Sequence, residues 1–180
     1  MAKFGAMKLL KRYIGAALAV LALASCVRDP RPDGPETAPG DLLPEFSVTM
    51  DDGSVLSTSA LEGSVSVLVF FHTGCPDCRE ELPVVQRVYE EFGARIVLAC
   101  ISREQGAAEI EAYWRENGLS LPYSAQEDRA VYSLFAYSGV PRVYVSGPDL
   151  RVFSVYDDDP VAAYDDLSGD IRTLLETAGL

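Results

Sequence analysis

The feature that most constrains this chain is a Cys-Pro-Asp-Cys sequence at residues 75–78, which separates two segments of different character. The segment before it, residues 65–71, is an almost continuous run of β-branched and aromatic residues, which is typical of a strand buried on both faces. The segment after it, residues 76–92, has apolar residues at helical spacing: Leu82, Val85, Val88, Tyr89 and Phe92. We therefore expect a strand that ends just before the cysteines and a helix that begins with them.

This position gives the two cysteines a redox chemistry. The first turn of a helix has unpaired backbone N–H groups and the positive end of the helix dipole, and both favour a thiolate at Cys75. Only a thiolate attacks a disulfide, and a second cysteine nearby can resolve the mixed disulfide that forms. We predict that Cys75 is the nucleophile, that Cys78 resolves, and that the two form a redox-active disulfide. Because Asp77, Glu80 and Glu81 disfavour further negative charge, we expect a rather reducing pair.

Two other uses of the cysteine pair fit the sequence less well. Tetrahedral zinc needs four ligands, and the further candidates are the single histidine, His72, and Cys100, which lies in an apolar run and is expected in the core. A structural disulfide that closes so short a loop would constrain the unfolded chain little. We therefore predict no metal site and no cofactor.

The N-terminal segment predicts export. Basic residues precede an apolar stretch at residues 14–24, which is too short to span a bilayer comfortably. The stretch ends in Leu-Ala-Ser-Cys, and small residues before a cysteine resemble the bacterial lipobox, in which that cysteine, here Cys26, becomes the lipidated N-terminus. Ordinary secretory cleavage, with Cys26 incidental, is the alternative.

These signals predict three parts of the chain. We expect a lipoprotein signal peptide at residues 1–25, a lipidated cysteine and proline-rich tether at 26–44, and one domain at 45–180. The protein would then be a membrane-anchored lipoprotein of the bacterial cell envelope that faces the periplasm. Disulfides persist in such an oxidising compartment, so a protein that reduces them needs its own electron supply.

The charge of the chain limits its partners. The sequence has 15 lysines and arginines against 27 aspartates and glutamates, a formal net charge of −12. Such acidity argues against binding to nucleic acid and against electrostatic attachment to anionic lipid. The partners that we expect are disulfide-containing or dithiol proteins of the cell envelope, an upstream thiol electron donor, and the membrane through the lipid anchor. We expect a monomer.

Beyond the tether, strand and helix patterns alternate. The expected elements are a hairpin of strands at 46–50 and 55–57, a strand at 65–71, a helix at 76–92, a strand at 95–101, helices at 106–117 and near 127–137, a second hairpin of strands at 143–145 and 152–156, and a final helix that contains Tyr164 to Leu175. This order predicts an α/β domain with a central mixed sheet and helices on both faces.

At residues 42–180 the chain resembles the thioredoxin superfamily, and within it the membrane-tethered TlpA/ResA-like thiol–disulfide oxidoreductases. Three segments carry the resemblance: residues 75–78, Glu81-Leu82-Pro83 and Gly139-Val140-Pro141. It implies a thioredoxin-like fold with an N-terminal β-hairpin extension. It also implies that Pro141 is the family's cis-proline, which with Val140 lies beside the redox pair and binds the substrate backbone.

The resemblance gives Glu81 a catalytic role. In the ResA-like branch a glutamate three residues after the second cysteine tunes the titration of that cysteine and assists proton movement, and Glu81 has this position. A partly buried carboxylate has a raised pKa and can accept the proton of the resolving thiol. The other interpretation is a solvated glutamate in the first turn of the helix, favoured there by the helix dipole.

The chain departs from the family near the cysteines. Val69 has the position of the buried aspartate of thioredoxin, and Gly74 replaces the tryptophan that usually precedes the first cysteine. His72 could approach Cys75, although a histidine that only lines the loop fits as well. Arg142 either faces the substrate groove or lies on the surface.

The sequence therefore predicts an exported thiol–disulfide oxidoreductase that reduces or exchanges disulfides in extracytoplasmic proteins. One alternative is a thiol peroxidase-type redoxin, but the Pro-x-x-x-Thr-x-x-Cys pattern of peroxiredoxins fails at Leu68 and His72. A second alternative is a non-catalytic binding module or metallochaperone that uses the same scaffold and cysteines to hold a partner or copper.

Overall fold

A computed structural model describes residues 36–180 of the chain. The predicted signal peptide, the predicted lipidation site at Cys26 and most of the predicted tether lie outside these described residues. Among residues 36–180, no helix has the length and apolar character needed to cross a membrane.

The centre of the domain is a mixed sheet of five strands in the order β5-β4-β3-β6-β7. Its strands are β5 (Tyr123–Ser124), β4 (Val97–Ser102), β3 (Ser66–Phe71), β6 (Arg142–Ser146) and β7 (Val152–Tyr156). Strand β3 pairs in parallel with β4 and antiparallel with β6, and all six of its residues are buried. A strand buried on both faces is apolar throughout, which explains the continuous run in the sequence. Because β3 is the central strand, the residues that follow it lie at the middle of the sheet, beyond the carboxyl end of β3.

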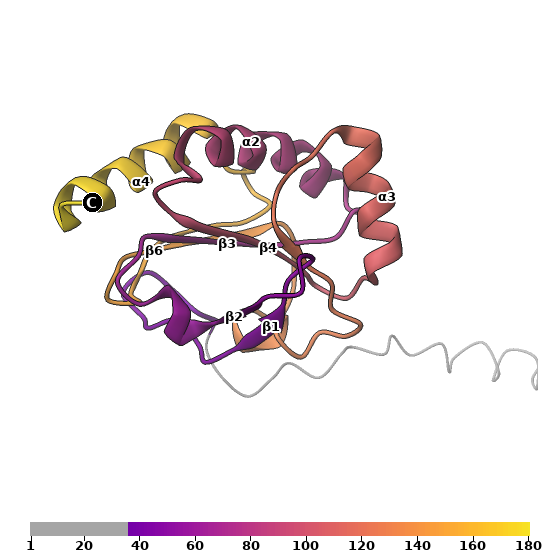
Figure 1. Cartoon of the computed structure of the whole chain (residues 1–180), viewed down its shortest axis with the longest axis horizontal. Helices are drawn as coiled ribbons and strands as arrows, with labels where there is room; N and C mark the ends of the chain where they lie inside the picture. Colours follow the sequence, from indigo (N-terminus) through magenta and orange to yellow (C-terminus); the bar gives the residue numbers. More distant parts are fainter. Residues whose placement is uncertain (1–35) are drawn as a thin grey trace, which may run out of the picture. The chain divides into compact units, whose positions relative to one another are not determined.

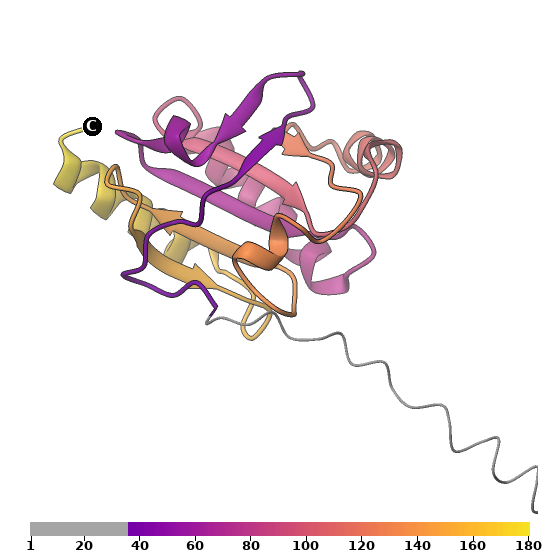
Figure 2. The same ribbon diagram turned by 90° about the horizontal axis from the view of Figure 1, so that it is seen from below.

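Different elements cover the two faces of the sheet. Helices α2 (Pro76–Phe92) and α4 (Tyr164–Ala178) pack against each other on one face (Figure 1). The hairpin of β1 (Ser47–Thr49) and β2 (Val55–Ser57) lies on the other face with the 3-10 turns η2 (Thr58–Leu61) and η3 (Tyr132–Leu134) (Figure 2). Helix α3 (Ala107–Asn117) borders β5, where the ring centroids of Trp114 and Tyr123 are 5.3 Å apart. The prediction of a mixed central sheet with helices and an N-terminal hairpin is confirmed. Of the helices expected on both faces, the second face has the 3-10 turns η2 and η3 beside the hairpin.

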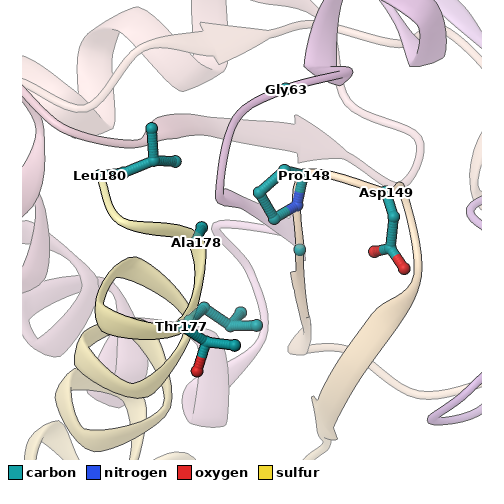
Figure 3. A pocket seen from close by; sticks show the side chains of 8 residues that line it. Gly63, Pro148, Asp149, Thr177, Ala178 and Leu180 are labelled. Atoms are coloured by element: carbon teal, nitrogen blue, oxygen red, sulfur yellow. The ribbon is translucent and has the colours of Figure 1, made fainter.

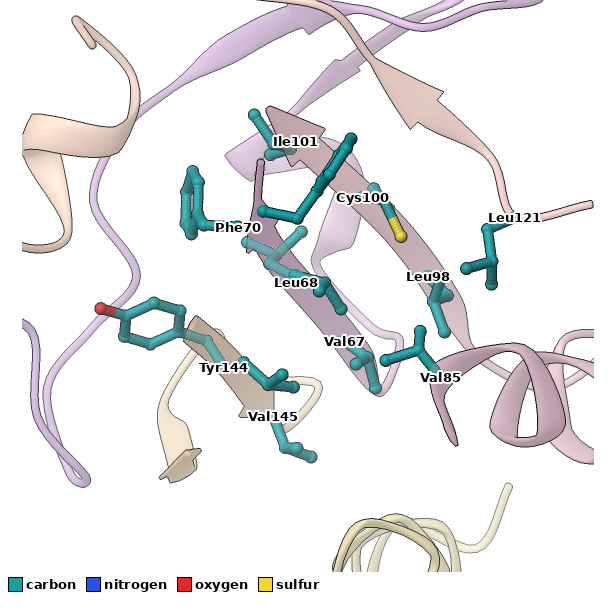
Figure 4. Packing of buried hydrophobic residues seen from close by; sticks show 14 of the residues in the cluster. Val67, Leu68, Phe70, Val85, Leu98, Cys100, Ile101, Leu121, Tyr144 and Val145 are labelled. Atoms are coloured by element: carbon teal, nitrogen blue, oxygen red, sulfur yellow. The ribbon is translucent and has the colours of Figure 1, made fainter. Parts of the chain in front are cut away.

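The core is continuous through the sheet (Figure 4). On one face, Val67 of β3 and Leu98 of β4 lie next to Val85 of α2. On the other, Phe70 packs against Tyr144 with ring centroids 6.0 Å apart. Cys100 is completely buried within this core, as the sequence predicted.

The prediction of a helix near residues 127–137 is wrong. This segment forms only the single 3-10 turn η3. A 3-10 turn places residues three apart on the same side, and here Tyr132 and Phe135 both pack on Phe70, with ring centroids 5.6 and 4.8 Å away. The sequence also missed β5, because two residues are too short for a periodic pattern.

The last residues of the expected tether pack against the domain. Thr37 donates a backbone hydrogen bond to Phe135 at 2.9 Å, and Leu43 donates one to Leu150 at 2.9 Å. The carboxylate of Glu36 lies 3.1 Å from the Arg142 guanidinium. The domain therefore begins before residue 45, where the sequence had placed its boundary.

Candidate redox site

The fold places Cys75 at the point where the central strand becomes a helix. Strand β3 ends at Phe71, and Cys75 is the N-cap of α2 with extended backbone angles, φ −82° and ψ 127°. Pro76 occupies the first helical turn, where its missing N–H has no intrahelical partner to lose. Cys75 is partly exposed, whereas Cys78 is fully buried one turn further along. A partner disulfide can therefore reach Cys75 and not Cys78.

A cis-proline lies directly beside Cys75. The Val140–Pro141 peptide bond is cis, as the family resemblance implied for Pro141. The Cys75 thiol donates a hydrogen bond to the Val140 carbonyl oxygen, with 3.2 Å between the sulfur and the oxygen. Both residues border an open hollow of about 400 Å³, which is lined by His72, Gly74, Cys75, Asp77, Arg103, Gly139, Val140 and Asp158.

The environment of Cys78 keeps it a thiol at neutral pH. Burial strongly raises its pKa, and the nearby Cys75 and Glu81 raise the pKa further, while a backbone hydrogen bond from His72 lowers it. Cys78 therefore needs a base before it can attack a disulfide.

Glu81 lies on the same inner face of α2 as Cys78. Its side chain is only 1% exposed, so the interpretation as a solvated glutamate is wrong. One carboxyl oxygen accepts a hydrogen bond from the Ala162 N–H at 3.2 Å, and the other is buried without a partner. Burial raises the pKa of Glu81 to about 8. A carboxyl that titrates near neutrality can exchange a proton with a buried thiol.

Buried polar residues that sequence reasoning missed hold the loop before Cys75. The side-chain amide of Gln105 accepts from the Thr73 N–H at 3.0 Å and donates to the Thr73 hydroxyl at 2.6 Å. Arg79 donates to the Thr73 carbonyl at 2.6 Å. Nothing in the sequence marks Gln105, because a glutamine outside any motif has the appearance of a surface residue.

Of two further residues that the sequence indicated, His72 borders the hollow at Cys75 and Arg142 does not. His72 lines the hollow, but its Nδ1 accepts a hydrogen bond from the Gly74 N–H at 2.9 Å, so its ring is bonded within its own loop. Arg142 does not border the hollow; its guanidinium binds Glu36 and donates to the Ser138 carbonyl at 3.1 Å. Arg103, which the sequence did not single out, is the arginine that lines the hollow.

A second hollow of about 430 Å³ lies at the opposite end of the sheet (Figure 3). It borders Gly63, which precedes β3, the turn between β6 and β7, and the last turn of α4. Because Cys75 follows the other end of β3, this hollow is separate from the redox site. Its lining has no cysteine.

This fold and this site are those of the thioredoxin-like thiol–disulfide oxidoreductases. The chain belongs to the AhpC/TSA family, whose model matches residues 39–159.

Two curated relatives are named thiol–disulfide oxidoreductases. The thiol–disulfide oxidoreductase ResA of Bacillus subtilis is 22% identical over 117 residues, which are 64% of this chain and 65% of that protein. The ResA of Oceanobacillus iheyensis is 25% identical over 138 residues, 74% of this chain and 70% of that protein. The matched part of this chain thus spans roughly two thirds of these relatives.

Solved structures share the fold. A Bacteroides thetaiotaomicron protein, described as a candidate protein disulfide isomerase, superposes with a TM-score of 0.71 at 19% identity, covering 80% of this chain and 92% of that one. A secreted thiol–disulfide isomerase of Corynebacterium glutamicum superposes with a TM-score of 0.67 at 20% identity, covering 81% and 95%.

Proposed function

We propose that this protein reduces or exchanges disulfides in other proteins through Cys75 and Cys78. One observation carries the proposal: a partly exposed cysteine at a helix N-terminus lies beside the cis Val140–Pro141 bond, with a fully buried cysteine one turn behind it. The names of the ResA relatives support the same reaction. The chemistry needs no cofactor, because the two thiols supply both electrons.

The reaction has two exchange steps. The Cys75 thiolate attacks one sulfur of a partner disulfide; a Cys75–partner disulfide forms, and the second partner sulfur leaves as a thiolate that takes a proton from solvent. The ionised form of Glu81, which is the minor form at pH 7 because its pKa is about 8, then takes the Cys78 proton, and the Cys78 thiolate attacks the Cys75 sulfur. The partner's first sulfur leaves as a thiolate, and it is protonated in turn. The partner becomes a dithiol and the protein a Cys75–Cys78 disulfide, which an upstream thiol donor reduces.

The backbone at Val140 and Pro141 aligns the substrate. Once Cys75 is in a mixed disulfide, it has no proton to donate, so the Val140 carbonyl loses the hydrogen bond that it accepts in the dithiol state. That carbonyl then accepts from a backbone N–H of the substrate strand, as in strand addition to an exposed peptide group.

The mixed disulfide can be trapped. In Cys78→Ser the second step is blocked, so we expect a stable mixed disulfide at Cys75. A reductant should release the partner protein, which mass spectrometry then identifies. Cys75→Ser is expected to form no adduct and to lose insulin reduction. As controls at the buried Cys100, Cys100→Ser should keep insulin reduction, and Cys78→Ser/Cys100→Ser should keep the trapped adduct. Insulin reduction by Cys75→Ser at the wild-type rate would refute the proposed roles.

The cellular setting is also part of the proposal. The N-terminal sequence favours export and lipidation at Cys26, and thereby a membrane-anchored protein that acts on envelope proteins as a monomer. Metabolic labelling with a fatty-acid probe should mark the wild type and not Cys26→Ala. A soluble, unlabelled wild type would show ordinary secretory cleavage instead.

The peroxidase and metallochaperone alternatives have direct tests. At the positions where peroxiredoxins have proline and threonine, the chain has the fully buried Leu68 and the hollow-lining His72, so the reduced protein should consume peroxide slowly. Rapid peroxide consumption would favour the redoxin. Copper retained by wild type and lost from a Cys75→Ser/Cys78→Ser variant, without insulin reduction, would favour the metallochaperone.

A further inference from the structure

Thr73, two residues before Cys75, has all of its polar groups bonded inside the protein. Its N–H donates to Gln105 Oε1, its hydroxyl accepts from Gln105 Nε2, and its carbonyl accepts from Arg79. Thr73 is 7% exposed and Gln105 6% exposed. Leaving such buried groups without partners is costly, so these bonds hold Thr73 firmly in place.

The orientation of the Gln105 amide follows from its partners. A backbone N–H can only donate, so the amide atom that faces the Thr73 N–H is the oxygen. The amide nitrogen faces the Thr73 hydroxyl and also the Glu109 carboxylate, 3.0 Å away, which accepts. The Gln105 backbone is fixed as well: its N–H donates to Gln126 at 2.7 Å, and its carbonyl accepts from the Ser102 hydroxyl at 2.9 Å.

Thr73 is a central residue of the turn that positions the nucleophile. The Cys75 N–H donates to the His72 carbonyl at 2.9 Å, which makes Thr73 and Gly74 the two central residues of a β-turn. The end of this turn is the N-cap of α2 and places the Cys75 sulfur 3.2 Å from the Val140 oxygen. A shift of Thr73 therefore moves the sulfur relative to both the helix N-terminus and the cis-proline.

We propose that Gln105 is a positioning residue for the thiol–disulfide reaction: by holding the Thr73 N–H and hydroxyl, it fixes the turn that presents Cys75. This inference rests on the proposed function only where insulin turnover is measured. Gln105 belongs to the segment after β4 and does not line the hollow, so it acts through Thr73 and has no part in the chemistry itself.

Gln86 is a control with the same hydrogen-bonding pattern in a more exposed place. Its amide oxygen accepts from the Ser120 N–H at 2.9 Å, and its nitrogen donates to the Ser120 hydroxyl at 2.9 Å and to Glu90, four residues later, at 3.1 Å. Gln105 makes the same set of bonds to Thr73 and to Glu109, also four residues later. Gln86 bonds Ser120 and Glu90 and not the turn at residues 72–75, so Gln86→Leu tests the loss of such a set of bonds without a change in that turn.

We would compare Gln105→Leu with Gln86→Leu in the full chain, using urea unfolding, the rate of Cys75 alkylation by iodoacetamide at pH 7, and kcat and KM for insulin reduction. Gln105→Leu should lower the alkylation rate and kcat by about tenfold to about a hundredfold, because small displacements of reacting groups cost that much. Gln86→Leu should keep both within about twofold of wild type.

The hydroxyl of Thr73 offers milder variants in case Gln105→Leu does not fold. Thr73→Ser keeps the hydroxyl and should behave as wild type, whereas Thr73→Val loses it and should lower the alkylation rate and kcat by about threefold or more. Wild-type alkylation in folded Gln105→Leu, or equal losses in Gln105→Leu and Gln86→Leu, would overturn the proposal. If wild type does not reduce insulin, the proposed function fails, and the alkylation rates still decide the positioning role.

Discussion

At the scale of single residues, the site depends on two groups that are ionised only at a cost. Cys78 and Glu81 lie on the inner face of α2, and burial raises the pKa of both. The family resemblance indicated Glu81, but the sequence left its burial open, since an exposed first-turn glutamate has the same position in the chain. Its spacing was a usable signal: Glu81 falls on the stripe of Cys78, Leu82 and Val85.

The raised pKa of Glu81 makes the stability of the protein depend on pH. The pKa is about 8 in the folded protein against an ordinary 4.5, so between these pH values the folded state binds the proton and the unfolded state has lost it. The free energy of unfolding should therefore fall as pH rises from about 4.5 to about 8, by at most about 1.4 kcal/mol per pH unit from this group. Glu81→Gln should remove that contribution.

Urea unfolding of wild type and Glu81→Gln at intervals from pH 5 to pH 9 measures the difference. The gap between the two curves should change steadily up to about pH 8 and then become constant. Curves that stay parallel from pH 5 to pH 8 would contradict a buried, protonated Glu81.

At the scale of elements, the sequence predicted a helix or strand correctly where residues typical of its first and last turns mark both ends. The prediction of α2 at residues 76–92 is confirmed at both ends, because Pro76 suits the first turn and Gly93 follows the last. The hairpins and the strand at 65–71 are confirmed within a residue or two. The prediction of a helix at 127–137 is wrong: Tyr132 and Phe135 pack on Phe70, a contact between segments distant in the chain that a local pattern does not show.

The η3 turn also connects the core to the substrate side of the site. The Tyr132 hydroxyl donates to the Gly139 carbonyl at 2.6 Å, directly before Val140 and Pro141. Tyr132→Phe should lower the free energy of unfolding by about 1–3 kcal/mol, because a carbonyl loses its partner. It should also raise the KM for insulin by roughly threefold, since Gly139 and Val140 border the hollow.

Tyr144→Phe is the matched control for that prediction. The buried Tyr144 hydroxyl donates to the Phe135 carbonyl at 3.3 Å, away from the cis-proline. It should lower stability somewhat and leave the KM unchanged. A Tyr132→Phe protein that is less stable but keeps the wild-type KM would confine η3 to a purely structural role.

At the scale of the whole molecule, the sequence predicted a mixed sheet with helices and the position of the dithiol between a strand and a helix, but not the start of the domain. Proline-rich composition favours an extended tether, yet residues 36–44 pack on the domain through backbone hydrogen bonds and the Glu36–Arg142 ion pair. Composition does not report such contacts, because they join segments that are distant in sequence. For the same reason the sequence missed Gln105, whose partner Thr73 is 32 residues away.

The acidity of the molecule extends to the hollow at Cys75. Asp77 and Asp158 line it, and the Asp158 carboxylate is so close to Gly139 that a β-carbon there would lie 3.5 Å from Oδ1. The only arginine in the lining, Arg103, is 2.9 Å from Glu104, whose carboxylate also binds Arg129, so two carboxylates and one guanidinium line the hollow. With a net charge of −12 over the chain, a positively charged partner should approach this opening faster than a negatively charged one.

Two disulfide peptides that differ only in lysine or glutamate beside the cysteines test this selectivity. At low ionic strength kcat/KM should favour the lysine peptide by roughly tenfold, and the ratio should approach one at about 1 M salt, where the Debye length is about 3 Å. Asp158→Asn should lower the ratio, whereas Asp149→Asn, in the hollow at the other end of the sheet, should not. A ratio that is unaffected by both salt and Asp158→Asn would mean that shape and backbone contacts alone select the substrate.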